Sequence, residues 1–172
     1  MRTGFFQRDA QVIYRLVPFT SSVFAVILSV VPLHVPGLAA TTPAFALMAV
    51  YYWTVYRPDL MPPSAVFVIG ILFDLLDGTP YIGLSSLTFL VLRSLILVFR
   101  GRAANQDFAL IWAGFLAAAA VAMGLQWLAV CVLSRTSLTA RPFMFQGLVT
   151  AAAFPIGDYL LAQLQRRLLA RA

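Results

Sequence analysis

An almost unbroken apolar run from Pro62 to Arg100 constrains this chain most, because it also carries three ionisable side chains, Asp74, Asp77 and Arg93. An ionisable group at the centre of a bilayer costs about 2.5–3.5 kcal/mol on insertion scales. A membrane-spanning chain tolerates that cost where the group is paired, faces the protein interior or a wet cavity, or lies near the interface. These three residues are therefore the first candidates for structural or functional roles.

Composition indicates the class of protein to which this run belongs. Hydrophobic residues make up 62% of the 172 residues and charged residues 10%, whereas soluble domains carry about 25% charge. The apolar blocks are too long for a soluble core, and they do not alternate in polarity as the strands of a membrane β-barrel do. The sequence therefore predicts an all-α, polytopic membrane protein.

Six apolar blocks predict a six-transmembrane-helix bundle that forms a single integral membrane domain over residues 1–172. The linkers between the blocks are short, which leaves no room for a separate soluble domain. The predicted spans cover about 12–33, 41–56, 62–77, 81–99, 108–133 and 143–165.

The distribution of arginine predicts the orientation of the bundle, since the chain has twelve arginines and no lysine. With a cytoplasmic N-terminus, nine arginines lie on the cytoplasmic side: Arg2, Arg8, Arg15, Arg57, Arg100, Arg102, Arg166, Arg167 and Arg171. Only Arg135 and Arg141 lie on the outer side. Cytoplasmic loops of membrane proteins are enriched in Arg and Lys, so both termini are expected in the cytoplasm. Arginines that flank spans also favour a lipid bilayer over nucleic acid as the partner of the positive charge.

The third span ends at a strong stop signal, Asp77-Gly78 followed by Pro80, because glycine adopts a left-handed turn and proline cannot continue a helix. From Pro63 to Asp77 the helix is about 22 Å long, against a hydrocarbon core of roughly 30 Å. The turn after it is therefore expected below the outer interface, facing protein or a water-filled cavity.

Three interpretations remain open for Asp74 and Arg93. They form a structural pair between the antiparallel third and fourth spans, or Arg93 extends to the cytoplasmic interface, or Asp74 is a carboxylate that responds to protons or ions. Asp77 shares a helical face with Asp74 and, beside Gly78, is expected to form the turn. In the last span, Asp158 follows Pro155 and is expected to reach a donor on a neighbouring helix. The alternative is that the kink at Pro155 and the Asp158 carboxylate form a site.

Two further sets of residues are interface candidates. Gly114, Ala118 and Ala122 recur every four residues, a spacing that allows close approach of two helices. The sequence leaves open whether that interface lies within the bundle or with another protein. Aromatic residues at the end of the second span are expected to form an anchor at the cytoplasmic interface; they are Tyr51, Tyr52 and Trp53.

Enzyme chemistry has little support in this sequence, and no cofactor or metal is expected. The chain has one histidine, His34, one cysteine, Cys131, and no lysine. These residues exclude a histidine-rich metal cluster, a disulfide within the chain and any lysine-dependent dyad. A pair of aspartates is the only catalytic arrangement left. Asp74 and Asp77 are predicted toward the outer side and Asp158 toward the inner side, and the sequence has no Gly-x-Gly-Asp motif.

Two segments resemble the MreD family of rod shape-determining membrane proteins. The first, residues 51–60, contains Arg57-Pro58 between the second and third spans. The second, residues 70–84, resembles a family pattern in which a Gly-x-x-x-Asp helix leads to a Gly–Pro–Gly turn. It is matched by Gly70, Asp74, Gly78, Pro80 and Gly83. Asp77 departs from the pattern, since the family has small or polar residues there.

This resemblance implies a non-catalytic scaffold in the bacterial inner membrane. Its family partners are the single-span protein MreC and the other members of the elongation complex (elongasome) that synthesises lateral peptidoglycan: the MreB filament, RodA and a class B penicillin-binding protein. The resemblance also implies a fold like the substrate-binding subunits of energy-coupling-factor transporters. An alternative function is therefore a small-molecule-binding subunit of a transporter, with an outer-facing cavity lined by Asp74, Asp77 and the Pro80 turn.

Overall fold

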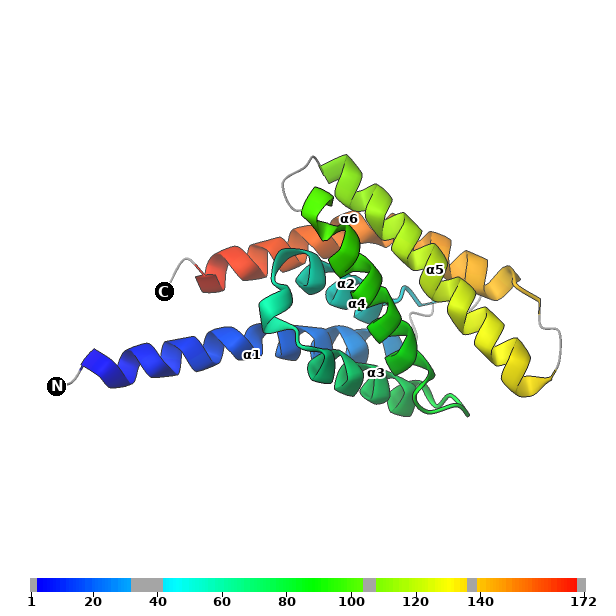
Figure 1. Cartoon of the computed structure of the whole chain (residues 1–172), viewed down its shortest axis with the longest axis horizontal. Coiled ribbons are helices and arrows are strands. Elements are labelled where there is room, and N and C mark those ends of the chain that lie inside the picture. Colours follow the sequence, from blue (N-terminus) through cyan, green and yellow to red (C-terminus); the bar gives the residue numbers. More distant parts are fainter. Residues whose placement is uncertain (1–2, 32–41, 104–107, 136–138, 170–172) are drawn as a thin grey trace.

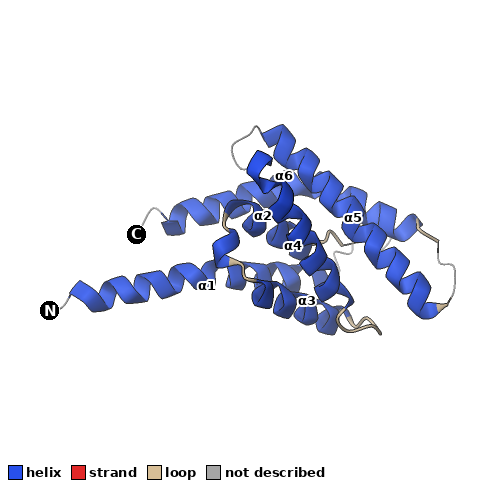
Figure 2. Cartoon of the chain, in the orientation of Figure 1, coloured by secondary structure: helices blue, strands red, loops and turns tan. Residues whose placement is uncertain are grey.

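The computed structural model describes residues 3–31, 42–103, 108–135 and 139–169, and within them the chain is all-helical (Figures 1 and 2). Each predicted span corresponds to one α-helix, and a single turn of 3-10 helix, η1, precedes α3. The elements are α1 (Thr3–Val30), α2 (Phe45–Tyr56), η1 (Pro58–Leu60), α3 (Pro63–Asp77), α4 (Leu84–Ala103), α5 (Phe108–Ser134) and α6 (Arg141–Leu169).

The bounds of α3 follow from its sequence. Pro62 is the N-cap and Pro63 the first helical residue, where the missing amide hydrogen of proline is not needed. The helix ends at Gly78, which adopts the expected left-handed conformation with φ 69°. By contrast, α1 begins at Thr3, well before the predicted span at residue 12. The apolar pattern locates only the part of α1 that can lie in a membrane, and the helix itself extends beyond that part into polar sequence.

Successive helices run in opposite directions, so the links between them lie at two ends of the bundle. Residues 78–83 join α3 to α4 at one end, called here the hairpin end, and α5 connects to α6 at the same end (Figure 1). The opposite end is called the terminal end, because both ends of the chain project from it in α1 and α6 (Figure 1).

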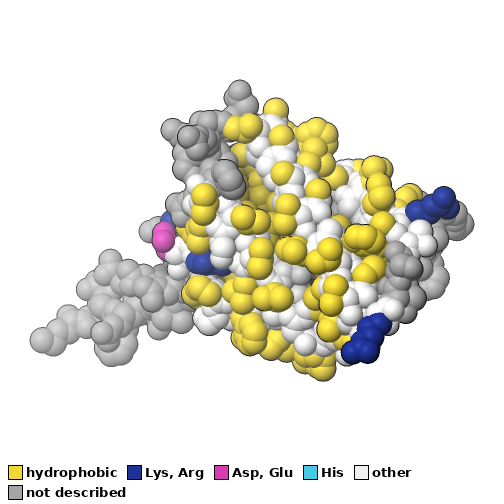
Figure 3. All heavy atoms as spheres, turned by 45° about the vertical axis from the view of Figure 1, so that its right-hand side comes forward, with side chains coloured by type: hydrophobic (Ala, Val, Ile, Leu, Met, Phe, Trp, Pro, Cys, Tyr) yellow, Lys and Arg dark blue, Asp and Glu magenta, His cyan; other side chains and the backbone are white. Residues whose placement is uncertain are grey.

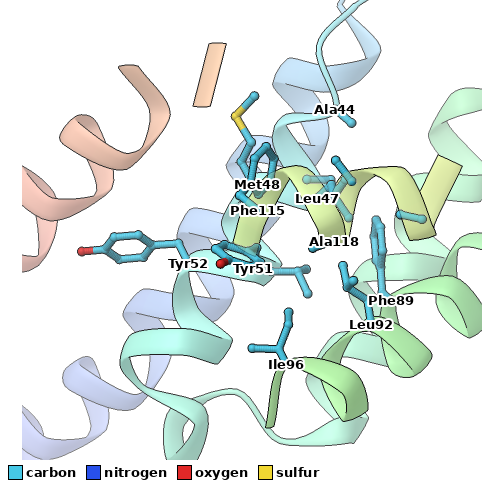
Figure 4. Packing of buried hydrophobic residues seen from close by; sticks show 14 of the residues in the cluster. Ala44, Leu47, Met48, Tyr51, Tyr52, Phe89, Leu92, Ile96, Phe115 and Ala118 are labelled. Carbon is cyan, nitrogen blue, oxygen red and sulfur yellow. The ribbon is translucent and has the colours of Figure 1, made fainter. Parts of the chain in front are cut away.

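Helix α2 is the centre of the bundle. All ten residues from Ala46 to Val55 are buried, and the helix contacts α1, α4, α5 and α6. A helix that is apolar around its whole circumference is expected to be enclosed by others. Side chains of α2, α4 and α5 meet around this core (Figure 4).

Hydroxyl groups of α1 and α6 accept hydrogen bonds from amides at the start of α2. The N-cap residue Ala44 has no side-chain cap of its own. Its amide instead donates to the Thr150 hydroxyl of α6 at 3.0 Å, and the Ala46 amide donates to the Ser29 hydroxyl of α1 at 3.0 Å. These bonds satisfy two of the amides that a helix leaves unpaired in its first turn. The first and last helices are thereby joined through the second.

The predicted aromatic anchor at the end of α2 is wrong, because its three residues lie in the core. Tyr51, Tyr52 and Trp53 are each at most 3% exposed. The Tyr51 hydroxyl donates to the Ile111 carbonyl at 3.0 Å and the Trp53 indole donates to Ser21 Oγ at 2.9 Å. Aromatic residues with one polar group are typical of membrane interfaces, but here that group bonds to a neighbouring helix.

Two helices are long and apolar enough to cross a membrane, α5 and the part of α6 over Arg141–Arg166, in the part of the chain that the structure describes. Shorter apolar helices cover Leu16–Val30, Phe45–Tyr56 and Leu84–Val98. On the face drawn in Figure 3, hydrophobic side chains cover the middle and charged side chains lie toward the two ends. This face therefore has an apolar band between two charged ends.

Candidate functional site

Asp74 caps the start of helix α4 from a neighbouring helix. Its carboxylate is 1% exposed and accepts a 2.7 Å hydrogen bond from the Gly83 amide. The Ser85 amide donates to both carboxylate oxygens, at 3.3 and 3.2 Å. The first amides of a helix carry partial positive charge and have no acceptor within the helix. The Asp74 carboxylate supplies both the missing acceptor and an opposite charge. Asp74 is thus a buried charge stabilised by backbone donors.

Backbone geometry in the turn brings those amides to Asp74. Gly78 has φ 69° and Gly83 has φ 99°, both in the region that L-residues with a side chain rarely adopt. Pro80 lies between them, and the Thr79 hydroxyl donates to the Asp74 carbonyl at 3.5 Å. The turn residues Gly78, Pro80 and Gly83 of the family pattern therefore lie beside Asp74 at one end of the α3–α4 hairpin.

Gly70 allows α3 and α4 to approach closely. A Cβ atom at this position would overlap the Cα of Ser86 and lie 2.5 Å from its backbone nitrogen. The Ser86 hydroxyl also donates to the Phe67 carbonyl at 2.9 Å. Only glycine leaves room for this contact, one turn before Asp74.

The predicted pair between Asp74 and Arg93 is not formed. Arg93 Nε donates instead to the Met61 carbonyl, at 3.0 Å, just before α3 begins. Ser85, which contacts Asp74, lies eight residues before Arg93 on α4, a rise of about 12 Å. The two side chains therefore bond at different depths in the hairpin, Asp74 to the amides of Gly83 and Ser85 and Arg93 to the Met61 carbonyl.

A cavity of about 260 Å³ opens beside Asp74 at the hairpin end. It lies between α2, α3, α4, α5 and α6, and α1 contributes Ser29. Its polar lining includes Asp77, Thr79, Gln126 and Gln146. The sequence predicts Asp77 as a turn residue, and the structure places it at the exposed rim of this cavity. The two glutamines come from α5 and α6.

The small residues of α5 at positions 114, 118 and 122 pack against other helices of the bundle. Ala118 and Ala122 are buried within the bundle. Next to Gly114, a Cβ atom would lie 2.7 Å from the Tyr51 hydroxyl, so this glycine makes room for the central helix. The interface that the 114–118–122 spacing predicts is therefore internal.

Aromatic stacking joins α2, α5 and α6 beside Gly114. The Phe115 and Phe154 rings are stacked with centroids 4.0 Å apart. Tyr51 packs edge-on against both, at 5.2 and 5.8 Å. Tyr51 and Phe115 are seen together at the centre of Figure 4.

Asp158 accepts no hydrogen bond from any residue that the structure describes. Its Oδ1 atom is buried and has no hydrogen-bond partner among the described residues. The expectation that Asp158 bonds a donor on a neighbouring helix is therefore wrong within the described residues. Buried polar atoms without a partner are rare in folded proteins, and the described structure offers no physical account of this one.

No group of three or more residues with metal-ligand chemistry is present among the described residues. His34 lies outside them, and Cys131 is a half-buried free thiol on α5. The residues that sequence reasoning missed are Ser85 and Gln146. Ser85 carries a recognisable signal, because it lies in the first turn of a helix, where unpaired amides seek an acceptor.

The fold and the site together define an all-helical bundle with an apolar surface, a hairpin capped by a buried carboxylate and a cavity beside it. Residues 10–164 of the chain match the sequence model of a family described as rod shape-determining protein MreD. The chain belongs to the MreD family, a membrane-associated and non-enzymatic family that acts with the cell-shape machinery. No curated protein and no solved structure matches the chain.

Proposed function

We propose that this protein is a six-span scaffold of the bacterial inner membrane, with both termini in the cytoplasm. It holds an MreC-like single-span protein and thereby positions the elongation complex with MreB, RodA and a class B penicillin-binding protein. The observation that carries this proposal is the family match over residues 10–164. The scaffold has no catalytic step, so its residues act by shaping the bundle and its partner surface.

The exposed surface supports a membrane location. Large apolar side chains are more than 60% exposed on every long helix, among them Phe24, Leu87, Val98, Val132 and Leu148. Soluble monomers rarely expose apolar patches this extensive, whereas a bilayer solvates them. The charged ends then lie at the two membrane surfaces, with the hairpin end outside.

Orientation gives the first test. We expect reporters fused after residue 172 to be cytoplasmic and reporters inserted in the 36–40 link to be periplasmic, because the arginine bias is nine to two. Paired phosphatase and fluorescent-protein fusions in growing cells measure both positions. A periplasmic C-terminus contradicts the six-span arrangement.

Partner assembly gives the second test, through two changes at the hairpin turn. We expect Gly78→Ala to lower the amount of co-purified single-span partner per folded protein. An L-residue in the left-handed conformation costs about 1–2 kcal/mol, and the turn positions α4. A Cβ atom there meets nothing within 4 Å, so the change acts on the backbone alone.

Asp77→Asn is the matched change one residue away, and we expect it to leave partner assembly almost unchanged. It removes a charge at the exposed rim and leaves the backbone as it is. In an ion-coupled carrier the order reverses, because the titrating group is lost. Greater damage from Asp77→Asn at equal folded yield contradicts the scaffold.

The cavity favours a second candidate, a small-molecule-binding subunit of a transporter. Short, broken helices in membrane transporters mark binding sites, and α3 ends beside this cavity. Such a subunit is expected to co-purify with a tight small ligand or an ATPase partner. A scaffold is expected to co-purify with a single-span protein, so one purification from native membranes distinguishes the two.

A further inference from the structure

The cavity at the hairpin end combines an apolar wall with polar side chains, some of which keep unused acceptor oxygens. Phe73 and Phe89 form one wall, with ring centroids 6.2 Å apart, and Phe143 lines another part. Ligand sites in proteins have this composition, a mostly apolar lining with a few polar groups that fix orientation. The cavity volume of about 260 Å³ is slightly below the roughly 300–1,000 Å³ of sites for drug-sized ligands. Its ligand is therefore compact.

The polar groups that remain available around this cavity are mainly acceptors. Gln126 donates through Nε2 to Ser85 Oγ, and Gln146 donates through Nε2 to the Thr42 carbonyl, each over a long 3.4 Å. Neither glutamine Oε1 accepts a hydrogen bond from any residue that the structure describes. A ligand with N–H donors can use these oxygens.

The charges around the cavity have one sign. Asp74 and Asp77 both line it, and none of the described lining residues is basic. The two oxygens of Asp74 are already occupied by the amides of Gly83 and Ser85. Asp77 has no hydrogen bond or ion pair within the described part of the chain. One carboxylate is thus satisfied and the other is available at the rim.

We propose that this cavity binds a small organic cation, an ammonium group attached to a compact apolar or aromatic body. The ammonium group carries three donors and no acceptor, which complements the Asp77 carboxylate and the two glutamine oxygens. The apolar body lies against the phenylalanines, whose ring faces also attract cations. This site is independent of the scaffold role and names the ligand class for the transport candidate.

Titration of the full-length protein with benzylammonium tests the proposal. Isothermal titration calorimetry in a neutral detergent, with protein-free micelles subtracted, measures binding by the folded protein. We expect saturable binding of benzylammonium, at least about tenfold tighter than that of neutral benzyl alcohol, since a hydrogen bond to a charged group is worth that much. Benzoate, an anion of similar size, is expected not to bind.

Two variants locate the site. Asp77→Asn is expected to weaken benzylammonium binding about tenfold and to leave benzyl alcohol unaffected. Gln146→Leu is expected to weaken it less. Asp59→Asn is the matched control, because Asp59 is an exposed aspartate in η1, at the terminal end.

Binding that does not saturate, equal affinity for benzyl alcohol, or full affinity in both Asp77→Asn and Gln146→Leu overturns the proposal. Co-purification of the single-span partner is measured on the same preparations. A wild-type protein that binds benzylammonium but does not co-purify with the single-span partner contradicts the scaffold alone. A wild-type protein that co-purifies with the partner but does not bind benzylammonium contradicts the ligand site alone.

Discussion

Gly70→Ala is expected to lower the free energy of unfolding by about 1–3 kcal/mol, the usual cost of forcing an extra carbon atom into a packed interior. The added methyl group meets the backbone of Ser86, which no rotamer change can move away. Helices α3 and α4 must therefore separate, and the amides that cap Asp74 move with α4. Thermal unfolding in detergent, followed by fluorescence-detected gel filtration, measures the effect.

Gly124→Ala is the matched control, the same change on helix α5. A Cβ atom at Gly124 meets nothing within 4 Å, and alanine stabilises a helix interior by roughly 0.5–1 kcal/mol over glycine. We therefore expect the two alanine variants to shift stability in opposite directions. Equal stability of both variants contradicts the close contact between α3 and α4.

Asp74→Ala is expected to destabilise the fold by about 3 kcal/mol, since each buried amide left without a partner costs roughly 1–3 kcal/mol. Two amides, those of Gly83 and Ser85, lose their acceptor. Asp74→Asn retains one acceptor oxygen, so its expected effect is smaller. The same thermal unfolding assay compares both variants with Asp77→Ala, which removes an exposed carboxylate three residues later.

Combination with Arg93→Gln distinguishes backbone capping from an ion pair. Because Asp74 and Arg93 have separate partners, we expect the losses in the double variant to add within about 0.3–0.5 kcal/mol. In a buried ion pair, the second change recovers part of the first loss. Recovery in the double variant contradicts capping by the backbone.

The sequence predicts the number and order of the helices, because six apolar blocks are separated by short links rich in polar residues, proline or glycine. Pro62-Pro63 and Gly78 define α3 to within a residue. The start of α2 is less well predicted: Thr42-Pro43 marks it, but the helix begins at Phe45. Its first amides bond to hydroxyls of α1 and α6, which lie far away in the chain and give no local signal.

The arrangement of the helices is harder to predict, since all six are apolar and periodicity cannot separate a lipid-facing side from a buried one. Tyr51 and Trp53 illustrate this, because their residue types are typical of a membrane interface but their side chains lie in the core. Asp74 illustrates a second limit. Its charge suggests a charged partner, whereas the actual donors are backbone amides, which every residue type except proline provides.

The hydrogen bonds that hold α2 have a consequence for synthesis of the protein. The donor at Ala44 and the acceptor at Thr150 are 106 residues apart. At a ribosome speed of roughly 5–20 residues per second, about 5–20 s pass between the synthesis of Ala44 and the synthesis of Thr150. During that interval the side of α2 that later meets α6 has no covering helix. The last helix to emerge therefore completes the core, and a chain released before residue 150 leaves its central helix open to chaperones and proteases.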